Sequence, residues 1–530
     1  MNADLLLAHY DRISDAPDAV ARLRKFILDL AVRGKLVEQN SDDESAEKLL
    51  LRITKNRSKA IGHGSELAIR FTPSEPEPFN LPSNWTWARL GSICSKTGSG
   101  STPRGGKSVY QQHGVPFLRS QNVYNDGLRL DDVAFIADET HEHMSGTAVE
   151  PGDLLLNITG GSIGRCCLVP QNMGQANISQ HVAIIRVALD GIQYYLHKMV
   201  LSPYFQSFVL SEQTGAGRLG LPKNKMDLIP VALPPLPEQH RIVAKVDELM
   251  ALCDGLEASQ REQEAHRDRL SASAHHHLNN GDDAEELRTH AQFFTSHLPR
   301  LTRRPEQIKQ LRQTILNLAF NCQLTSTTEP ASAPILLKDV ATLQNGYAFK
   351  SEWFVRQGIR LLRNANVSHG EICWDDVVCL PEKMAGEFQR FRLEVGDIVL
   401  SLDRPFIVTG TKVARIRVQD LPCLLLQRVG RFQIRPTRIS KDYLFLWLHS
   451  PQFTGQIDPG RSNGVPHISS KQVEATEILV PSLAEQHRIV AKVDELMALC
   501  DKLEASLSTA QTETSRLLES VLHHALEASA

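Results

Sequence analysis

The sequence predicts an α+β protein: two mixed α/β domains separated by two long helices that form an antiparallel coiled coil, with a pseudo-twofold internal repeat. The first observation is that the segment EQHRIVAKVDELMALCDGLEAS at 238–259 returns at 485–506 with a single change. The second is that a weaker repeat precedes each copy, since ten of the 32 positions of 5–36 are identical in 293–324. The third is that both copies of the long segment carry an apolar pattern of helical spacing. One chain therefore contains two versions of the same unit.

The repeats divide the chain into alternating helical and mixed segments. We expect an N-terminal helical unit at 1–50, a linker at 51–82, a first mixed domain at 83–236, a central long helix at 237–280, a second helical unit with its linker at 281–334, a second mixed domain at 335–483 and a C-terminal long helix at 484–530. Stretch 37–82 is polar and ends rich in proline, and 325–334 replaces it in the second copy. Both read as connectors.

Short apolar runs between turn residues characterise the two mixed domains. GVPFLRSQNV at 114–123 parallels GIRLLRNANV at 358–367, and EPGDLLL at 150–156 parallels EVGDIVL at 394–400. Aliphatic runs separated by Gly, Asn and Asp are typical of strands and turns. The domains therefore repeat weakly, whereas the helical frame repeats closely.

A heptad seam runs along each long helix. Its apolar residues alternate in steps of four and three: Ile242, Val246, Leu249, Cys253 and Leu256 in the first copy, and Ile489, Val493, Leu496, Cys500 and Leu503 in the second. This spacing favours helix–helix packing, so we expect the two helices to pair antiparallel and hold the domains apart. A helix over 238–278 would be about 60 Å long. The alternative is an ordinary amphipathic helix on a globular core.

Composition indicates an ordinary folded protein, with 42% hydrophobic and 22% charged residues and a net charge of −3. Charge is uneven, because 83–235 carries +1 and 335–482 carries +4, which leaves −8 elsewhere. The nine cysteines form no C-x-x-C pair, so we expect no zinc site, and free thiols suit a reducing cytoplasm. The sequence shows no apolar run long enough for a signal peptide or a membrane span. We expect a cytoplasmic protein.

Motifs with a catalytic appearance lack their proper context. GAGRLG at 215–220 is followed at once by Pro222, which argues against a dinucleotide site and favours a loop that approaches a nucleic-acid backbone. His275 to His277 and His523–His524 occupy repeat-related places, but adjacent histidines on a helix point apart, so we expect a helix-end surface and no metal. Signatures of adenine methylation and of hydrolases are absent from the sequence. We expect no catalytic residues and no cofactor in this chain.

The ordered set of repeated motifs resembles the specificity subunit of type I restriction–modification enzymes. The match is carried by PLPEQHRIV at 235–243, SLAEQHRIV at 482–490, LRKFILDLA at 23–31 and LRQTILNLA at 311–319. Each motif alone is weak, but the set occurs twice in the same order. The resemblance covers nearly the whole chain.

The resemblance implies that the mixed domains are target-recognition domains, each reading one half of a split double-stranded DNA target. The long helices would fix the gap between the halves and dock two methyltransferase subunits, which bind S-adenosylmethionine and methylate adenine. Further restriction and translocase subunits would supply cleavage driven by ATP and Mg²⁺. The chain itself would be a non-catalytic DNA-recognition subunit. The alternative function is a coiled-coil adaptor whose two domains bind proteins.

Basic and amide side chains in the domain loops are the candidate contacts to phosphates and base edges. In the first domain they are Lys96, Arg104, Lys107, Arg119, Gln121, Asn122, Arg165, Gln180, Arg218, Lys223, Asn224 and Lys225. In the second domain they are Lys350, Arg363, Asn364, Asn366, Arg404, Lys412, Gln427, Arg428, Arg461, Asn463 and Lys471.

Two of these candidate pairs are repeat-related, Arg119 with Arg363 and Asn122 with Asn366. Because the two half-sites should differ, such pairs are equally consistent with a structural role. Unpaired loop residues such as 223–225 are better candidates for reading bases. A solvated surface charge remains the alternative for each.

Overall fold

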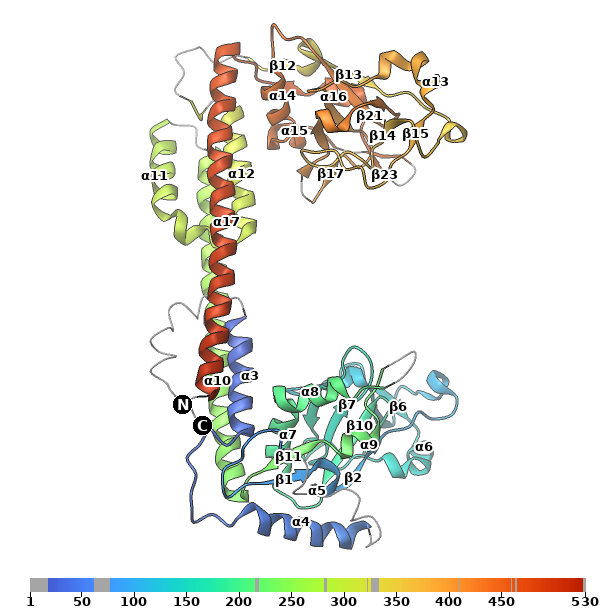
Figure 1. The fold of residues 1–530 in the computed structure, drawn as a ribbon, viewed down its shortest axis with the longest axis vertical. Coiled ribbons are helices and arrows are strands. Elements are labelled where there is room, and N and C mark those ends of the chain that lie inside the picture. The colour runs from blue at the N-terminus through green and yellow to red at the C-terminus, as the bar shows by residue number, and fades with distance from the viewer. Residues whose placement is uncertain are drawn as a thin grey trace. The chain divides into compact units, whose positions relative to one another are not determined.

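Helical segments and two mixed domains alternate along the chain (Figure 1). The computed structural model describes residues 18–61, 77–214, 219–280, 284–321, 323–325, 333–408, 410–458, 460–462 and 465–527. The chain forms two compact units, the first from 1–261 with 511–530 and the second from 262–510. Two helices of 45 residues each contribute to both units: α10 (Leu236–Asn280) and α17 (Leu483–Glu527). Their first residues lie within one residue of the predicted starts.

Helix α3 (Ala19–Val32) runs antiparallel to α10 in the first unit. Arg24 forms an ion pair with Glu257 at 2.7 Å. Further along the chain, Gln39 donates a hydrogen bond to Glu238 at 2.7 Å. As residue numbers rise on one segment they fall on the other, so the two chain directions are opposed.

The same helix runs parallel to the end of α17. Arg22 donates to the Ser515 carbonyl at 3.3 Å, and Lys35 donates to the Leu526 carbonyl at 2.5 Å. Because α3 is antiparallel to α10 and parallel to α17, the two long helices are antiparallel within the first unit. This confirms the predicted direction of the pair.

Helix α12 (Pro305–Phe320) has the equivalent role in the second unit, and Pro305 is its first residue. Gln307 donates to Asp268 and Asn317 donates to Asn279, both at 3.1 Å, so α12 runs parallel to the end of α10. A further short helix, α11 (Ala284–Leu301), joins α10 to α12.

The start of α17 runs antiparallel to α12. Arg312 pairs with Glu504 at 2.9 Å, while Thr325, beyond α12, donates to Glu485. Both units therefore repeat the same three-helix arrangement. Arg24 with Glu257 and Arg312 with Glu504 are repeat-related ion pairs.

The heptad seam faces partners other than those expected. Ile242, Val246 and Cys253 are buried with α3 and the first mixed domain, and Leu249 and Leu256 line the same cluster. In the second copy, Ile489, Val493 and Cys500 are buried with α12 and the second mixed domain, with Leu496 and Leu503 at the margin. The seam thus fastens each long helix to its own domain and short helix. This is the amphipathic packing that the sequence left as an alternative.

A buried polar pair begins α10. Glu238 is 1% and Gln239 0% exposed. Burial raises the pKa of Glu238, whose carboxylate accepts a hydrogen bond from Gln39. The Gln239 amide donates to the Pro234 carbonyl at 2.9 Å. The pair therefore joins the helix to the first mixed domain and to the segment after α3.

The repeated pair Glu485 and Gln486 begins α17 and is equally buried. The Gln486 amide donates to the carbonyls of Arg438 and Pro481, both at 2.9 Å, and accepts from the Ser440 amide at 2.8 Å. The first turn of each long helix is thus held by hydrogen bonds to the backbone of its own domain.

Part of the predicted linker at 51–82 is helical, which corrects that prediction. Helix α4 (Ala46–Ile61) buries Ala46, Leu49 and Ile53 against the first mixed domain. Arg57 donates to the Cys94 carbonyl at 3.1 Å. The apolar stripe of this helix is only one residue wide. Because the residues around it are mostly charged or polar, the sequence suggested a linker and not a helix. Residues 62–76 lie outside the described part of the chain.

The first mixed domain contains two principal sheets with strand orders β2-β10-β7-β8 and β6-β3-β9. Strand pairs β1–β11 and β4–β5 complete it. Its strands are β1 (Thr86–Arg89), β2 (Cys94–Ser99), β3 (Val115–Leu118), β4 (Val123–Tyr124), β5 (Gly127–Leu128), β6 (Ala134–Ile136), β7 (Leu154–Asn157), β8 (Cys166–Leu168), β9 (Asn177–Ile178), β10 (Val182–Val187) and β11 (Pro230–Leu233). Its α-helices are α5 (Leu90–Ile93), α6 (Asp138–His143), α7 (Gln193–Leu201), α8 (Pro203–Ser211) and α9 (Lys223–Asp227).

The second mixed domain has the same topology. Its principal sheets are β13-β21-β16-β19 and β15-β14-β20, and β12 pairs with β24 as β1 pairs with β11. Its strands are β12 (Ile335–Leu336), β13 (Ala341–Asn345), β14 (Ile359–Leu362), β15 (Cys379–Leu380), β16 (Ile398–Ser401), β17 (Phe406–Ile407), β18 (Gly410–Thr411), β19 (Val413–Arg415), β20 (Cys423–Leu425), β21 (Val429–Ile434), β22 (Gly460–Ser462), β23 (Val465–His467) and β24 (Glu477–Ile478). Its α-helices are α13 (Glu382–Ala385), α14 (Lys441–Trp447), α15 (Pro451–Gly455) and α16 (Ser470–Glu474).

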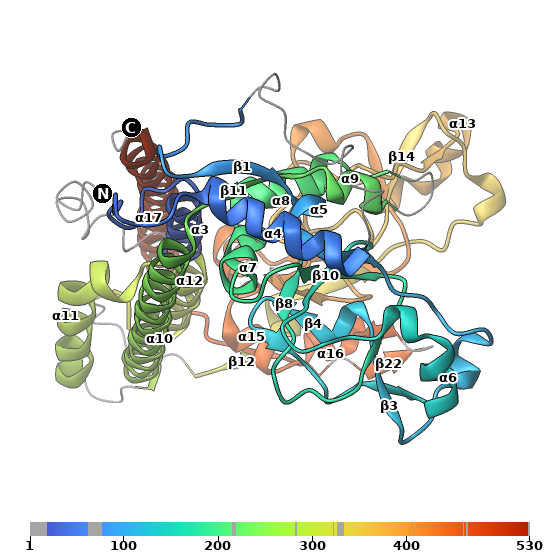
Figure 2. The ribbon, with the colours of Figure 1, turned by 90° about the horizontal axis from the view of Figure 1, so that it is seen from below.

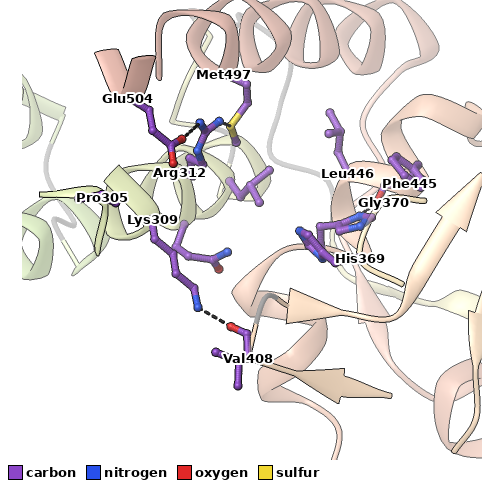
Figure 3. A pocket seen from close by; sticks show the side chains of 13 residues that line it. Pro305, Lys309, Arg312, His369, Gly370, Val408, Phe445, Leu446, Met497 and Glu504 are labelled. Carbon is purple, nitrogen blue, oxygen red and sulfur yellow. Dashed lines mark hydrogen bonds and ion pairs between the residues drawn. The ribbon is translucent and has the colours of Figure 1, made fainter. Parts of the chain in front are cut away.

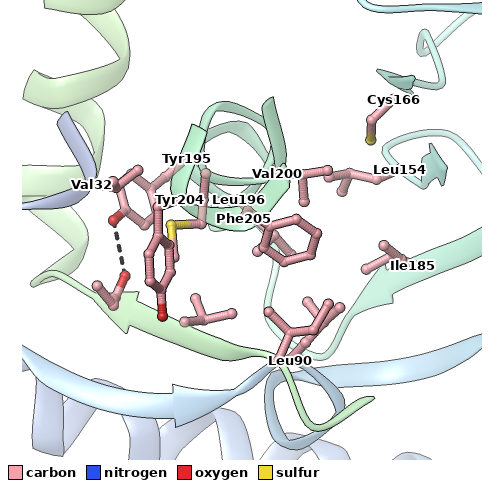
Figure 4. Close-up of a cluster of buried hydrophobic side chains, with 14 of the residues drawn as sticks. Val32, Leu90, Leu154, Cys166, Ile185, Tyr195, Leu196, Val200, Tyr204 and Phe205 are labelled. Carbon is pink, nitrogen blue, oxygen red and sulfur yellow. Dashed lines mark hydrogen bonds between the residues drawn. The ribbon is translucent and has the colours of Figure 1, made fainter. Parts of the chain in front are cut away.

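One continuous core joins the first mixed domain to its helices. Helices α7 and α8 lie between the sheet and α3 (Figures 1 and 2). Figure 4 shows Val32 of α3 beside Tyr195 and Tyr204, with Phe205 reaching toward Ile185 of the sheet. The Tyr195 hydroxyl donates to the Ala232 carbonyl at 2.9 Å. The domain is therefore packed as one body with α3 and the start of α10.

Two buried histidines make stability depend on pH. Burial lowers the pKa of His197 and of His275 to about 4, and each is less than one-tenth exposed. A histidine whose folded pKa is depressed stabilises the fold fully above the unfolded pKa of about 6.5, and that contribution is lost as pH falls toward 4. We expect the free energy of unfolding, measured by urea denaturation, to fall over this window by up to about 3 kcal/mol for each histidine.

The double variant His197→Gln/His275→Asn should reduce this pH dependence, because neither replacement titrates. His449, whose pKa burial also lowers to about 4, should keep its share of the slope. His240→Gln, which changes an exposed histidine, serves as the control and should retain the full slope. An unchanged slope in the double variant would contradict this origin.

Candidate nucleic-acid interface

Loops of the first mixed domain converge on the edge of its four-stranded sheet that is formed by the ends of the strands. Strands β2 and β7 end at this edge, where Ser99 pairs with Ala183 and Asn157 pairs with Val182. Strands β10 and β8 begin there. The loops 100–114, 158–165 and 179–181 therefore leave the domain on the same side.

Two further loops join this edge through hydrogen bonds. The Asn157 amide donates to the Ser120 carbonyl at 2.8 Å, which brings in the turn after β3. The Leu221 amide donates to the Ile158 carbonyl at 2.9 Å, which brings in 219–225. We call this surface the loop edge of the first domain.

The loop edge gathers most of the predicted contacts of the first domain. Its exposed members are Arg104, Gln121, Gln180, Lys223, Asn224 and Lys225. Arg165 is half-buried and lies over the ring of Tyr124 at 4.6 Å. Arg218 and the side chain of Lys107 lie outside the described part of the chain.

Lys96 lies apart from the loop edge. It sits within β2 opposite Arg186, and burial, followed by the charge of Arg186, lowers its pKa. Arg186 itself pairs with Asp153 at 2.7 Å and with Glu150. Lys96 thus belongs to an intradomain charge network, which favours a structural role over a DNA contact.

The second mixed domain builds an equivalent loop edge. Ser401 pairs with Val429 and Asn345 pairs with Gly430, so β13 and β16 end where β21 begins. The Ile468 amide donates to the Leu402 carbonyl at 2.9 Å, the counterpart of the bond from Leu221 to Ile158. Loops 346–358, 402–412, 426–428 and 465–470 meet at this edge.

Predicted contacts of the second domain also gather here. The exposed ones are Lys350, Arg404, Gln427 and Lys471, and the half-buried ones are Asn364, Lys412 and Arg428. The Lys412 ammonium donates to the Asn364 carbonyl, and burial, followed by the charge of Arg404, lowers its pKa. Asn463 and the side chain of Arg461 lie outside the described residues.

Asn122 is a buried structural residue and not an available DNA contact, which corrects its assignment. It is 1% exposed, and its carbonyl oxygen accepts from the Arg119 amide at 3.0 Å. Its own amide donates to the Arg129 carbonyl at 2.9 Å. The Arg119 side chain in turn donates to the Asp132 carbonyl at 2.8 Å.

Asn366 repeats this arrangement and is corrected for the same reason. It is 2% exposed, accepts from the Arg363 amide at 3.1 Å and donates to the Cys373 carbonyl at 3.0 Å. The Arg363 guanidinium pairs with Asp376 at 2.6 Å. The repeat-related residues thus hold the turn after β3 and β14, the structural role that the sequence left open.

A charged cluster at the second loop edge joins the predicted contact Arg428 to Asp403 and His467, two residues that were not predicted. His467 Nδ1 lies 2.7 Å from Asp403 Oδ1, and the Arg428 guanidinium lies 3.6 Å from the same oxygen. Arg404 and Arg428 have φ values of 46° and 74°, a left-handed conformation that is uncommon outside glycine. Strain of this kind is often found where side chains are held for function.

The equivalent positions in the first domain carry different residues, Thr159, His181 and Gly220. Thr159 Oγ1 lies 2.7 Å from His181 Nδ1, and Thr159 forms a β-bridge to Gly220, as Asp403 does to His467. The repeat offset of 247 could have revealed this substitution, since it aligns His181 with Arg428 and Gly220 with His467. The two edges share a backbone and differ in chemistry.

A cavity of about 630 Å³ lies where α12, the start of α17 and the second domain meet (Figure 3). Its charged wall residues already have partners, because Arg312 pairs with Glu504 and Lys309 donates to the Val408 carbonyl at 2.5 Å. Leu316, Phe445 and Leu446 contribute apolar wall. The cavity therefore offers little to a charged ligand, and the loop edges remain the candidate functional sites.

The three histidines at the end of α10 differ from one another. His275 is 7% exposed, bonds Thr314 at 2.9 Å and packs on Phe294, so the expected surface role is wrong for this residue. His276 and His277 are exposed.

We expect Asn122→Ala to destabilise the protein by about 2 kcal/mol or more, because it leaves buried backbone groups unpaired. Asn366→Ala should have the same effect. Gln121→Ala alters the exposed neighbour and should change unfolding free energy by less than about 0.5 kcal/mol. Chemical denaturation measures all three, and equal stability of Asn122→Ala and Gln121→Ala would contradict the structural role.

Known proteins share this domain pattern. The family model of the type I restriction modification DNA specificity domain matches residues 82–267 and again 334–510. The chain is 34% identical to the Type I restriction enzyme EcoAI specificity subunit of Escherichia coli, over 96% of this chain and 94% of that protein. It is 24% identical to the EcoEI specificity subunit of the same species, with the same coverage of both chains.

The fold also matches a solved chain from a study of complex assembly and conformational transition of the type I R-M system. The TM-score is 0.51 at 19% identity, covering 85% of this chain and 99% of that one. No helix within the described ranges is long and apolar enough to span a membrane. With two copies of the specificity domain and a relative aligned over nearly its full length, the chain belongs to the type I restriction–modification specificity subunit family.

Proposed function

We propose that each mixed domain of this specificity subunit reads one half of a bipartite double-stranded DNA target. The observation that carries the proposal is the pair of loop edges, which share one backbone arrangement and present different side chains. A shared scaffold with divergent edge chemistry suits two half-sites of different sequence. Phosphate contacts would set the register of each domain and contacts to base edges would supply sequence.

The chemical difference between the two loop edges indicates which residues would read which kind of base. Thr159 and His181 offer a hydroxyl and an imidazole, whereas Arg428 offers a guanidinium oriented by Asp403 and His467. Arginine reads guanine through paired hydrogen bonds in the major groove. We therefore expect Arg428 to contact a guanine in the half-site of the second domain.

We further propose that the long helices set the distance between the two half-sites. Each is an unbroken helix of 45 residues, which corresponds to about 67 Å at 1.5 Å per residue. Two turns of duplex span about 70 Å. A rigid spacer of this length suits readers that face separated major-groove segments.

Two methyltransferase subunits are the proposed partners of the helical frame. The frame repeats almost unchanged while the domains diverge, and a surface present twice suits two copies of one partner. Leu252 and Leu499, which are repeat-related, are 59% and 52% exposed on the long helices. These two leucines are exposed apolar groups that both copies of the frame offer to such a partner. Restriction and translocase subunits would join through this assembly.

We propose that the chain recognises DNA without a catalytic residue or cofactor of its own. S-adenosylmethionine, ATP and Mg²⁺ would bind to the partner subunits. The eight described cysteines are free thiols, which supports a cytoplasmic setting.

Replacing residues 335–482 by the corresponding domain of another specificity subunit tests the division of labour. The half-site read by the second domain should change, while the other half-site and the spacing stay the same. Selection of random duplexes by gel shift, with the methyltransferase partner present, measures all three. Binding without any split motif would support the adaptor alternative instead.

Arg428→Gln should weaken recognition of the half-site of the second domain by about 1–3 kcal/mol and relax base preference there. The half-site of the first domain should be read as before. The matched control is Arg438→Gln, because Arg438 is exposed and follows β21 at its other end. Equal losses in both variants would indicate general electrostatic attraction and would rule out base reading by Arg428.

A further inference from the structure

Three metal-ligating side chains meet where α10 ends and α11 begins, far in sequence from either mixed-domain edge. They are His277 on α10 and Glu286 and His290 on α11, and their ligand atoms all lie within 4.8 Å of one another. All three belong to the second unit. Their arrangement has no part in DNA recognition as proposed above.

The two α11 residues are already spaced as ligands of one ion. Glu286 and His290 lie one turn apart on the same face of the helix, and Glu286 Oε1 is 3.6 Å from His290 Nε2. In a tetrahedral site with bonds of about 2.1 Å, neighbouring ligand atoms are about 3.4 Å apart. The observed separation is close to this value.

His277 supplies the third group from a different helix. Its ring stacks on that of His290, with centroids 4.6 Å apart and an interplanar angle of 12°. Glutamate–histidine pairs at i and i+4 are common on helix surfaces, but a second imidazole from a neighbouring helix is not part of that pattern.

Apolar packing fixes the two helices on which these ligands stand. Ala274 and Leu278 of α10 are buried with Phe294 and Leu301 of α11. His275 is buried in the same region, against Phe294. The backbone positions of the three ligands are therefore set by a core, and only side-chain rotation is needed to close them on an ion.

We propose that His277, Glu286 and His290 bind one Zn²⁺ ion, with water in the fourth position. Two imidazoles and one carboxylate form a ligand set suited to this ion, and calcium and magnesium prefer oxygen ligands. The bound ion holds α11 against the end of α10. Among the described residues, these three form the one group of three such side chains with ligand atoms this close together.

Zinc titration of the full-length chain without a histidine tag tests the site. We expect one ion per chain by calorimetry, a rise in melting temperature with zinc, and a tetrahedral spectrum with Co²⁺. His277→Ala, Glu286→Gln and His290→Ala should each weaken binding by about tenfold or more and abolish the thermal shift. Circular dichroism of the metal-free variants confirms that these exposed or half-exposed changes leave the fold intact.

His524→Ala and His276→Ala are the matched controls. His524 is the repeat equivalent of His277, and His276 is its exposed neighbour on α10. Both controls should bind zinc as the unmodified chain does. Absence of stoichiometric binding, or equal weakening in the controls, would overturn the site. Neither outcome bears on DNA recognition, which a parallel gel shift on the same variants reports separately.

Discussion

The buried glutamate–glutamine pair at the start of each long helix is the constraint on which both units depend. Gln239 and Gln486 bond backbone carbonyls of their own mixed domains, and Glu238 and Glu485 accept from the segments that follow α3 and α12. An unpaired buried amide or carboxylate is costly, so these bonds leave little freedom in how the helix departs. A helix that begins in a fixed direction carries that direction along its whole length. The identity of these residues in both copies thus has a mechanical reason.

The ion pairs of Arg24 and Arg312 extend the same arrangement from the start of each helix to its middle. Between them, the apolar residues at four-and-three spacing bury the helix on its short partner and its domain. The loop edges lie at the ends of strands whose sheets belong to the same hydrophobic cores. Rigid attachment of this kind lets loops vary in sequence without altering where they are presented. The helical frame that repeats in both copies therefore allows the loop edges to differ between the two domains.

Much of this was predictable from the sequence, because repetition reveals what a single copy hides. Two matching seams indicated long helices, and matching strand motifs indicated two domains of one topology.

Helix α4 was missed because its buried stripe of Ala46, Leu49 and Ile53 lies among charged residues. The side of a helix that an apolar stripe faces is likewise not encoded in its spacing, so the seam was assigned to the wrong neighbours. Asn122 and Asn366 were listed as candidate DNA contacts, with a structural role left open, because the sequence does not show whether an amide in a turn bonds DNA or its own backbone. The cluster of Asp403, Arg428 and His467 unites three distant segments, and only the sheet register brings them together.

The first unit is closed by residues from opposite ends of the chain, since Lys35 bonds the Leu526 carbonyl 491 positions away. The second unit is one continuous stretch from 262 to 510. During translation, residues of the second unit are therefore complete before the last helix reaches α3. Until then, the apolar face of Phe26 and Leu30, which Ala525 later covers, lacks its final partner. A chain that ends at residue 510 therefore contains every residue of the second unit and lacks the part of α17 that covers α3.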